Sequence, residues 1–401
     1  MVCKGKRPHI GIFGRRNVGK SAFINSISRQ HVAIVADTPG TTTDPVRKAI
    51  EIPGIGPVLF IDTAGVDDIG ELGKMRVNRT MRAIRHIDMA ILIVAHNRFD
   101  SWEKELIVQF TAYKVPWFLI HNKSDLEAPH MKELPVSCLP YNALAPDNRD
   151  AIVAAIRDLL PKTAYQHASL IGDILSYGDL VVLVTPIDAE APEGRLILPQ
   201  VQLIRDVLDN DCLALVVKER ELDLLWRKVP CRPKLVVTDS QAFLKVDAVV
   251  PKDIMLTSFS IILARHKGPF DKYLEGTPRI DNLRDNDRVL ILESCSHHVA
   301  ADDIGRVKIP RWLSNYTGKN LQFDVVPGLN DYPRPVTDYQ LVIQCGGCMV
   351  TPKQLTNRLQ PALEANIPVS NYGMTIAYLH GIYQRAVAPF VAGLSGPPAY
   401  L

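Results

Sequence analysis

Short apolar runs of strand length alternate with amphipathic segments of helix length along the whole chain. This alternation is typical of α/β domains, in which helices connect the strands of largely parallel sheets. Up to Leu160 the pattern predicts strands at His9–Phe13, Val58–Asp62, Met89–Val94 and Trp117–His121. It also predicts helices at Ala22–Ser28 and at Arg149–Leu160, and Pro161 ends the second of them.

The rest of the chain repeats this pattern in two blocks, which meet at Gly268 and Pro269. The first block predicts strands at Leu180–Thr185, Cys212–Val217, Lys234–Thr238 and Asp253–Leu256, with helices at Pro199–Asp209, Glu219–Lys228 and Ser258–Lys267. The second predicts strands at Arg288–Glu293, Gln322–Val326, Tyr339–Gln344 and Ile367–Asn371, with helices at Ile309–Tyr316 and Pro352–Ala365. We therefore expect an α/β domain at residues 1–165, followed by two smaller parallel-sheet α/β domains at 179–268 and 269–401.

Composition sets limits on this picture. Hydrophobic residues make up 47% and charged residues 22% of the 401 residues, a balance that excludes a disordered chain. No apolar run reaches the roughly 18 residues that a membrane-spanning helix needs, and no signal-peptide stretch follows the basic start. We expect a cytoplasmic protein with no membrane partner. The formal net charge of +3 does not demand a nucleic-acid partner.

The strongest chemical signal follows the first predicted strand, where the sequence reads Gly14-Arg15-Arg16-Asn17-Val18-Gly19-Lys20-Ser21. This segment fits G-x-x-x-x-G-K-[ST] and leads into a predicted helix that starts at Ala22. In that context backbone N–H groups close around phosphate oxygens, Lys20 reaches the β and γ phosphates, and Ser21 binds Mg²⁺. A plain glycine-rich turn is the alternative. We expect every residue from Gly14 to Ala22 to contribute to the nucleotide site.

Further segments follow in the order that a GTP site requires. Asp62 ends a predicted strand, where its carboxylate can hold Mg²⁺ through water, and the Gly65 N–H can sense the γ-phosphate. Asn122-Lys123-Ser124-Asp125 follows another strand, and the Asp125 carboxylate can accept both N1–H and the exocyclic amine of guanine. We expect Ser137-Cys138 to present a backbone N–H to guanine O6. Thr41, Thr42 and Thr43 lie in a loop suited to a switch. These motifs together predict a P-loop GTPase domain.

The same pieces resemble the TrmE/Era-like class of small GTPases, and the resemblance covers the chain up to Leu160. The switch match is Gly40-Thr41-Thr42-Thr43-Asp44. The resemblance implies that Ser21, Thr42 and Asp62 bind Mg²⁺. The class has Arg where this chain has Thr43, so a role carried by that Arg does not transfer. It usually has Ala at position 138, and a backbone contact tolerates Cys138 instead.

The residues expected to drive hydrolysis differ from those of Ras-like enzymes. Val66 stands where those enzymes place a Gln that orients water, so intrinsic hydrolysis should be slow. In related potassium-activated GTPases an Asn at the position of Asn17 binds K⁺, which implies potassium-stimulated hydrolysis here. Glu71 is a weaker candidate for orienting water, and a solvated acid at a helix start is the favoured alternative. We expect the Arg15 and Arg16 side chains to face phosphate or solvent.

The cysteines of the last block form a second candidate site. Seven cysteines, an odd number, argue against a disulfide framework. Cys295-Ser296-His297 follows one predicted strand, and Cys345-Gly346-Gly347-Cys348 follows another. Because the carboxyl ends of parallel strands share one sheet edge, three thiolates and one imidazole can converge there. This donor set fits a 4Fe–4S cluster or a structural zinc ion, and ordinary reduced cysteines or a redox pair are the third alternative.

A GTPase domain, a middle block without chemical motifs and the two cysteine segments together resemble the HydF family of FeFe-hydrogenase maturation GTPases. The resemblance implies a scaffold that holds a 4Fe–4S cluster through Cys295, Cys345 and Cys348, with His297 or solvent on the fourth iron. It also implies a homodimer formed through the middle block. The implied partners are two radical-SAM enzymes, which help to supply a transient diiron subcluster precursor, and an apo FeFe-hydrogenase, which receives it.

Two other functions are also compatible with the sequence. Many members of the TrmE/Era-like class are RNA-associated, acting on ribosomes or transfer RNA. The near-neutral charge and the lack of a basic aromatic module after the GTPase domain count against that function. The second alternative function is a GTPase switch whose last domain is a protein-binding module stabilised by zinc.

Overall fold

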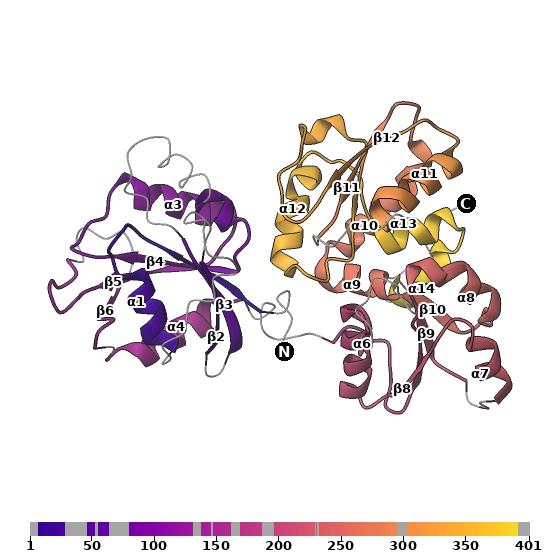
Figure 1. Ribbon diagram of the computed structural model, residues 1–401, viewed down its shortest axis with the longest axis horizontal. Helices are drawn as coiled ribbons and strands as arrows, with labels where there is room; N and C mark the ends of the chain where they lie inside the picture. Colours follow the sequence, from indigo (N-terminus) through magenta and orange to yellow (C-terminus); the bar gives the residue numbers. More distant parts are fainter. Residues whose placement is uncertain are drawn as a thin grey trace. The chain divides into compact units, whose positions relative to one another are not determined.

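The computed structural model describes residues 7–28, 46–52, 55–63, 80–130, 138–145, 147–161, 169–186, 196–228, 230, 232–294 and 303–391. Contacts between residues divide the chain into two compact units, Met1–His167 and Ala168–Leu401. Figure 1 labels the helices and strands of each unit.

The first unit is built on a six-stranded sheet with the order β2-β3-β1-β4-β5-β6. Its strands are β1 (His9–Phe13), β2 (Val46–Ile52), β3 (Gly56–Asp62), β4 (Met89–Val94), β5 (Trp117–Asn122) and β6 (Cys138–Tyr141). Only β2 runs antiparallel to its neighbour; the other pairs are parallel. Helices α1 (Lys20–Ser28), α3 (Ser101–Ala112) and α4 (Arg149–Leu159) cover the sheet (Figure 1). Every residue of β4 is buried, as expected for a parallel strand covered on both faces.

The four strands and two helices predicted for this unit are present, whereas β2, β6 and α3 were not predicted. β2 carries charged residues among its apolar ones because it lies at the sheet edge. β6 is short and contains Pro140, which weakens its strand pattern. Two apolar cores, one on each face of the sheet, hold the unit together.

The second unit contains two four-stranded sheets, and all of their strand pairs are parallel. The first has the order β10-β9-β7-β8, from β7 (Leu180–Val184), β8 (Leu213–Val217), β9 (Leu235–Thr238) and β10 (Met255–Ser258). The second has the order β12-β11-β13-β14, from β11 (Arg288–Leu292), β12 (Gln322–Val326), β13 (Leu341–Gln344) and β14 (Val369–Asn371). The predicted α/β fold class is confirmed: a six-stranded, mainly parallel sheet with covering helices is followed by parallel-sheet α/β structure.

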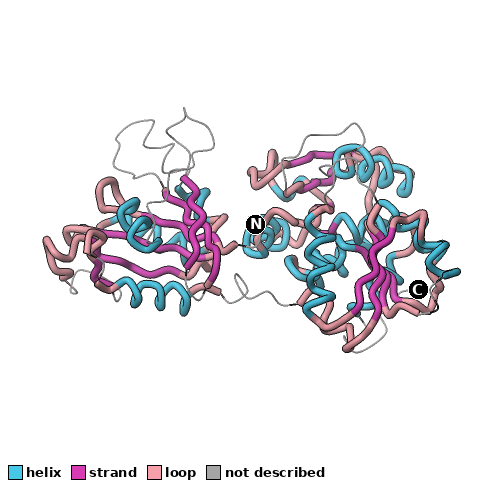
Figure 2. The backbone as a smooth tube through the Cα atoms, turned by 60° about the horizontal axis from the view of Figure 1, so that its bottom comes forward, coloured by secondary structure: helices cyan, strands magenta, loops and turns pink. Residues whose placement is uncertain are grey.

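The helices of the second unit lie on both sides of these sheets (Figure 2). They are α6 (Leu198–Asp209), α7 (Leu222–Lys228), α8 (Phe243–Val249), α9 (Phe259–Lys267), α10 (Phe270–Gly276), α11 (Ile309–Thr317), α12 (Pro352–Glu364), α13 (Tyr372–Leu379) and α14 (Tyr383–Val391). The strand and helix positions agree with the sequence pattern to within a few residues, but α8, α10, α13 and α14 were not predicted. Among the described residues, none of the helices has the length and apolar character needed to cross a membrane.

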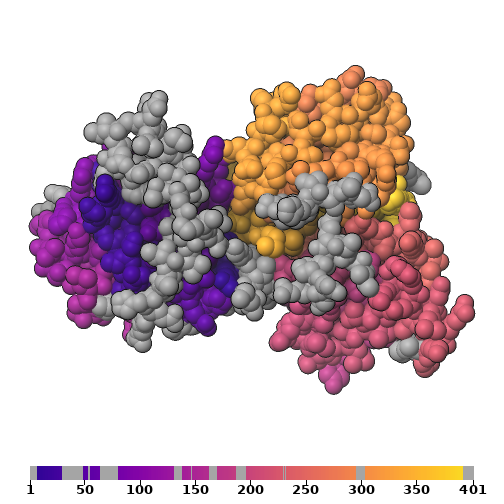
Figure 3. Space-filling view, in the orientation of Figure 1, coloured from indigo at the N-terminus to yellow at the C-terminus, as the bar shows by residue number. Residues whose placement is uncertain are grey.

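One hydrophobic core runs through both sheets of the second unit. It contains Val181 and Val236 from the first sheet together with Leu290 and Val342 from the second. Helix α9 contacts elements of both sheets, and four consecutive residues in its middle, Ile261, Ile262, Leu263 and Ala264, are all buried. The surfaces of residues 170–268 and 269–391 meet directly in the space-filling view (Figure 3). The two sheets therefore fold around shared side chains.

The C-terminal helix reinforces this connection. α14 contacts β10 of the first sheet, although it follows the strands of the second. Its Arg385 donates to Asp247 Oδ1 at 2.6 Å, and Phe390 packs edge-on against Phe270 at 6.0 Å between ring centroids. The last described helix is thus fastened to α8 and to β10 of the first sheet.

Candidate functional site

The loop after β1 has the backbone geometry that a phosphate-binding loop requires. Gly14 has φ of +151°, and a Cβ there would lie 2.4 Å from the carbonyl oxygen of Ile93. Gly19 has φ of +93°, and a Cβ there would lie 2.2 Å from Asn122 Nδ2. Both positions therefore exclude any side chain. Asn17 also has a left-handed conformation, with φ of +63°.

Lys20 is the first residue of α1, and its ammonium group lies against the loop. Lys20 Nζ donates to the carbonyl oxygens of Gly14 and Arg15, each at 2.8 Å. These are neutral acceptors at the mouth of the loop. A phosphate bound at the N-terminus of α1 would offer the same ammonium a charged acceptor.

Ser21 and Asp62 lie together at the carboxyl ends of β1 and β3. Ser21 Oγ donates to Asp62 Oδ2 at 3.2 Å, while Asp62 Oδ1 is buried without a hydrogen-bond partner among the described residues. Burial raises the pKa of Asp62, and the charge of Lys20 and the Ser21 hydrogen bond act against this rise. A hydroxyl and a carboxylate oxygen in need of a partner are hard oxygen ligands, so these residues fit Mg²⁺.

Asn122 joins the phosphate loop to the segment expected to bind guanine. Its Nδ2 donates to the carbonyl oxygen of Val18 at 2.8 Å, and its Oδ1 accepts the N–H of Ala143 at 3.2 Å. Lys123 follows with a left-handed φ of +60°, and Asp125 is exposed. The Asp125 carboxylate is therefore accessible to a base that lies beside this edge of the sheet.

The position of Cys138 differs from the sequence-based expectation. Cys138 begins β6 and pairs with Leu119, whereas Tyr141, at the end of β6, pairs with Asn122. Because the strands are parallel, Cys138 lies at the edge remote from Asn122 and Asp125. Burial also raises the pKa of its thiol to about 11. Residues 142–144, just after β6, reach the expected edge instead, and predicting β6 in full would have indicated them.

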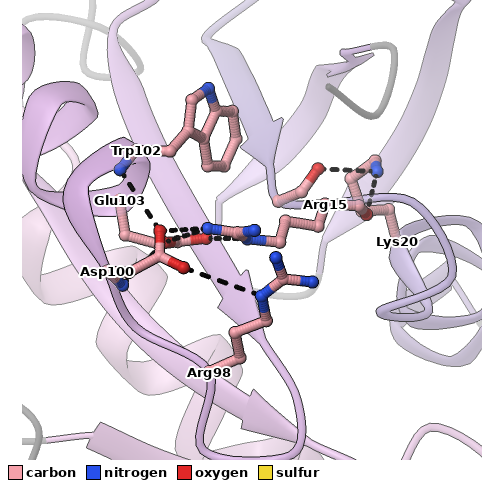
Figure 4. A network of polar contacts seen from close by, with 7 residues as sticks. Arg15, Lys20, Arg98, Asp100, Trp102 and Glu103 are labelled. Atoms are coloured by element: carbon pink, nitrogen blue, oxygen red, sulfur yellow. Dashed lines mark hydrogen bonds and ion pairs between the residues drawn. The ribbon is translucent and has the colours of Figure 1, made fainter. Parts of the chain in front are cut away.

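Arg15 is the second difference, because its side chain faces neither phosphate nor solvent. Arg15 Nε donates to Glu103 Oε1 at 2.7 Å, and its second nitrogen donates to Glu103 Oε2 at 3.0 Å (Figure 4). It also pairs with Asp100, the N-cap of α3, and its guanidinium lies 6.0 Å from the ring centroid of Trp102. In Figure 4 this side chain points away from Lys20, toward the start of α3. Arg16 is exposed, as expected.

In the second unit, the contacts of Cys345 bring the two cysteine-bearing loops together. Cys345 follows β13, and its Sγ accepts the backbone N–H of Ser294 at 3.1 Å. The Cys345 thiol in turn lies 3.0 Å from Ser294 Oγ. Ser294 follows β11 and directly precedes Cys295 in the sequence. The strand ends of β11 and β13 therefore meet at Ser294 and Cys345, while the convergence of all four expected ligands stays a prediction.

Cys345 and Cys348 both lie outside any disulfide and have intermediate exposure. Thiolates are soft ligands that suit iron–sulfur clusters and zinc, so the chemistry of these donors fits either group. Within the described ranges, no group of three or more His, Cys, Asp or Glu residues could hold a metal ion. The predicted site residues outside the described ranges are Thr41, Thr42, Gly65, Glu71, Ser137, Cys295 and His297.

The sheet order and the loop around Lys20 define the first unit as a P-loop GTPase. A family model described as a 50S ribosome-binding GTPase matches residues 9–123. Two other models match most of the second unit: the hydrogen maturase F dimerization domain at residues 170–268 and the hydrogen maturase F tetramerization domain at residues 271–389. Together these two cover more than half of the chain. The chain belongs to the hydrogen maturase F family, and its domain names point to self-association.

Curated relatives share only part of this chain. The tRNA modification GTPase MnmE of Prochlorococcus marinus (strain NATL1A) is 40% identical over 118 residues, which cover 29% of this chain and 25% of that protein. MnmE of Nitrosomonas europaea is 36% identical over 163 residues, which cover 40% of this chain and 35% of that protein. The chain thus spans about a quarter to a third of the length of these relatives.

Solved structures of GTPases are also similar to this chain. An Era variant from Aquifex aeolicus bound to GDP and AlF4⁻ is 19% identical, with a TM-score of 0.32, covering 55% of this chain and 95% of that one. The G domain of the T. maritima FeoB iron transporter is 16% identical, with a TM-score of 0.31, covering 38% and 98%. Scores this low add nothing to the topology described above.

Proposed function

We propose that this protein is a GTP-hydrolysing scaffold that holds a 4Fe–4S cluster and carries a diiron subcluster precursor to apo FeFe-hydrogenase. The observation that carries the proposal is the union of a complete phosphate loop with two hydrogen maturase F domains in one chain. The contact between Ser294 and Cys345 supports a metal site between the two cysteine loops. We assign the protein to the cytoplasm, in keeping with its described cysteines, which lie outside any disulfide.

In this proposal the loop from Gly14 to Ala22 binds the phosphates of GTP. Lys20 exchanges two carbonyl oxygens for the β and γ phosphates, and Ser21, Thr42 and Asp62 hold Mg²⁺. Gly65 senses the γ-phosphate. Asp125 selects guanine, and the loop at residues 142–144 replaces Ser137 and Cys138 as the source of a backbone N–H for guanine O6.

We propose that hydrolysis is slow and stimulated by K⁺. Val66 cannot orient water, and Glu71 is the weaker candidate for that role. Asn17 is exposed and has a left-handed backbone conformation within the phosphate loop. An amide oxygen there can join the ligands of a potassium ion that stabilises charge on the reacting phosphate.

We propose that Cys295, Cys345 and Cys348 hold the cluster and that His297 or solvent occupies its fourth iron. A cluster with one weakly held position can bridge a second metal fragment for a limited time. The protein orients these ligands through the strand ends of β11 and β13, which lie side by side. The diiron fragment is cargo in this scheme, supplied with the two radical-SAM enzymes and released to apo-hydrogenase.

We further propose that β8 is the surface through which two copies associate. β8 is the edge of the first sheet of the second unit, and its Leu213 and Val216 are 60% and 41% exposed. An edge strand with exposed apolar residues invites pairing with another chain. Val201 and Leu208 on neighbouring α6 are exposed as well, which extends the apolar surface.

One anaerobic purification of the full chain tests the proposal against its alternatives. Brown protein with iron and sulfide, no zinc and no nucleic acid is the expected result. Colourless protein with bound zinc would overturn the cluster assignment in favour of a zinc-stabilised switch. RNA that co-purifies and stimulates GTP hydrolysis would overturn the scaffold in favour of an RNA-associated GTPase. Such an outcome would fit the relatives that modify tRNA.

A further inference from the structure

Two deeply buried cations hold the backbone of the loops that carry the cysteines. Lys267, the last residue of α9, is only 7% exposed. Its Nζ donates to the carbonyl oxygens of Gly347 at 2.9 Å, Val350 at 3.0 Å and Cys348 at 3.4 Å. The Lys267 ammonium group thus binds three backbone carbonyl groups of the turn that contains Cys348.

Arg358, on α12, likewise binds backbone carbonyl groups, here at the loop that follows β11. It donates to the carbonyl oxygen of Glu293 at 2.6 Å and to that of Val326 at 2.8 Å, and it is buried. Glu293 lies two residues before Cys295 in the sequence. Burial lowers the pKa of Arg358, while the negative charge of a Cys345 thiolate acts in the opposite direction. The guanidinium is therefore within electrostatic reach of that sulfur.

The hydrogen bonds from Lys267 stabilise the tight turn at Gly347. Gly347 has φ of +64°, and a Cβ there would lie 2.6 Å from Leu355 Cδ1, so the turn is tight and pressed against α12. Carbonyl groups that converge in such a turn repel one another unless a donor lies between them. Lys267 is that donor. It belongs to the segment matched by the dimerization model, whereas the turn belongs to the segment matched by the tetramerization model.

Charge gives these residues a second role. Three thiolates make a bound iron–sulfur or zinc group a net anion, and burying an anion is costly without nearby positive charge. Lys267 and Arg358 supply positive charge beside the loops while they donate hydrogen bonds to backbone carbonyl oxygens of the same loops.

We infer that Lys267 and Arg358 are positioning residues for an anionic metal–thiolate group: they fix the cysteine loops and neutralise the group that the loops hold. This inference rests on the proposed metal site. A nearby positive charge favours the more negative, reduced state of a cluster. Loss of that charge should therefore make its reduction potential more negative. Loss of the hydrogen bonds should loosen the loop even in protein without metal.

The test uses the full chain with Lys267→Met, Lys267→Gln and the control Lys272→Met, an exposed lysine five residues further on. In metal-free protein, peptide mass spectrometry follows the alkylation rates of Cys345 and Cys348. We expect faster alkylation in Lys267→Met, partial protection in Lys267→Gln, which keeps two donors, and no change in Lys272→Met. After reconstitution, a chelator should remove iron about tenfold faster from Lys267→Met, as is usual when the support of a ligand is lost.

The reduction potential separates charge from geometry, since both Lys267 variants lose the charge and only one loses all the donors. Both should have potentials more negative than wild type and Lys272→Met. Equal alkylation, iron loss and potential in all four proteins would overturn the inference. If wild type binds no metal, the proposed metal site fails, while alkylation still decides whether Lys267 fixes the loop. If Lys267→Met fails to fold, Lys267→Gln is compared with wild type and Lys272→Met instead.

Discussion

The guanidinium of Arg15, in the phosphate loop, forms a two-pronged ion pair with the carboxylate of Glu103, in the first turn of α3. The side chains are 12% and 1% exposed, so this is a buried contact. Glu103 also accepts the backbone N–H of Asp100 at 3.0 Å and so helps to cap α3. The phosphate loop is therefore fastened to α3 on one side and, through Asn122, to β5 on the other.

From this contact we predict that Arg15→Met weakens GDP binding about tenfold. Removing one partner of a buried ion pair costs about 3–5 kcal/mol, of which only a part would appear in nucleotide affinity. Arg98→Ala is the matched control, because Arg98 is exposed and reaches only Asp100 of the same network. Stopped-flow measurement of GDP release checks the prediction. Equal release rates in Arg15→Met and Arg98→Ala would contradict it.

Asp125→Asn should move nucleotide preference from GTP toward XTP. The amide offers one acceptor where the carboxylate offers two, so guanine loses a charge-assisted hydrogen bond worth about 1.5–3 kcal/mol. GTP affinity should therefore fall by about 10- to 100-fold. Competition binding with GTP and XTP measures the change, and Asp147→Asn, on an exposed turn nearby, serves as control. Unaltered discrimination in the Asp125 variant would remove Asp125 from the guanine site.

Asn17→Gly should abolish stimulation of GTP hydrolysis by K⁺. Glycine keeps the left-handed backbone at this position without strain, so the substitution removes the amide alone. The measurement compares turnover in KCl and NaCl at equal ionic strength, for wild type and variant. Wild type should be faster in KCl and the variant equal in both salts. A variant that still prefers KCl would assign the ion to other ligands.

Leu213→Lys should convert an oligomer of the full chain into a smaller species. A lysine on an exposed edge strand discourages pairing with a second edge, because the two charges would lie close together. Light scattering at several protein concentrations measures the mass. The control is Leu224→Lys, which adds the same charge to an exposed position of α7. If both variants keep the mass of wild type, the copies associate through another surface.

The pattern of apolar residues along the sequence predicted most of the strands, because a buried parallel strand is marked by the apolar residues within its own segment. The run Met89–Val94 is apolar throughout, and it forms β4 with those bounds. The phosphate loop was equally predictable, since Gly14 and Gly19 have backbone geometry that few other residues allow.

Features that depend on distant partners were not predictable in this way. The side-chain direction of Arg15 is set by Glu103, which lies 88 positions along the chain, and no local pattern indicates it. The position of Cys138 depended on the register of β6 against β5, and the four-residue strand with its proline gave little signal. Lys267 reads as one of three basic residues in the last turn of α9, and only the fold brings it to Gly347.

The shared core of the second unit also limits how such a chain can be rearranged by recombination. Val181 and Val342 pack into the same interior, and α9 contacts elements of both sheets. An exchange of residues 170–268 for a foreign counterpart would have to preserve the shape of both faces of α9 and its hold on the Gly347 turn. Residues 170–268 and the segment that carries the cysteines should therefore be inherited together.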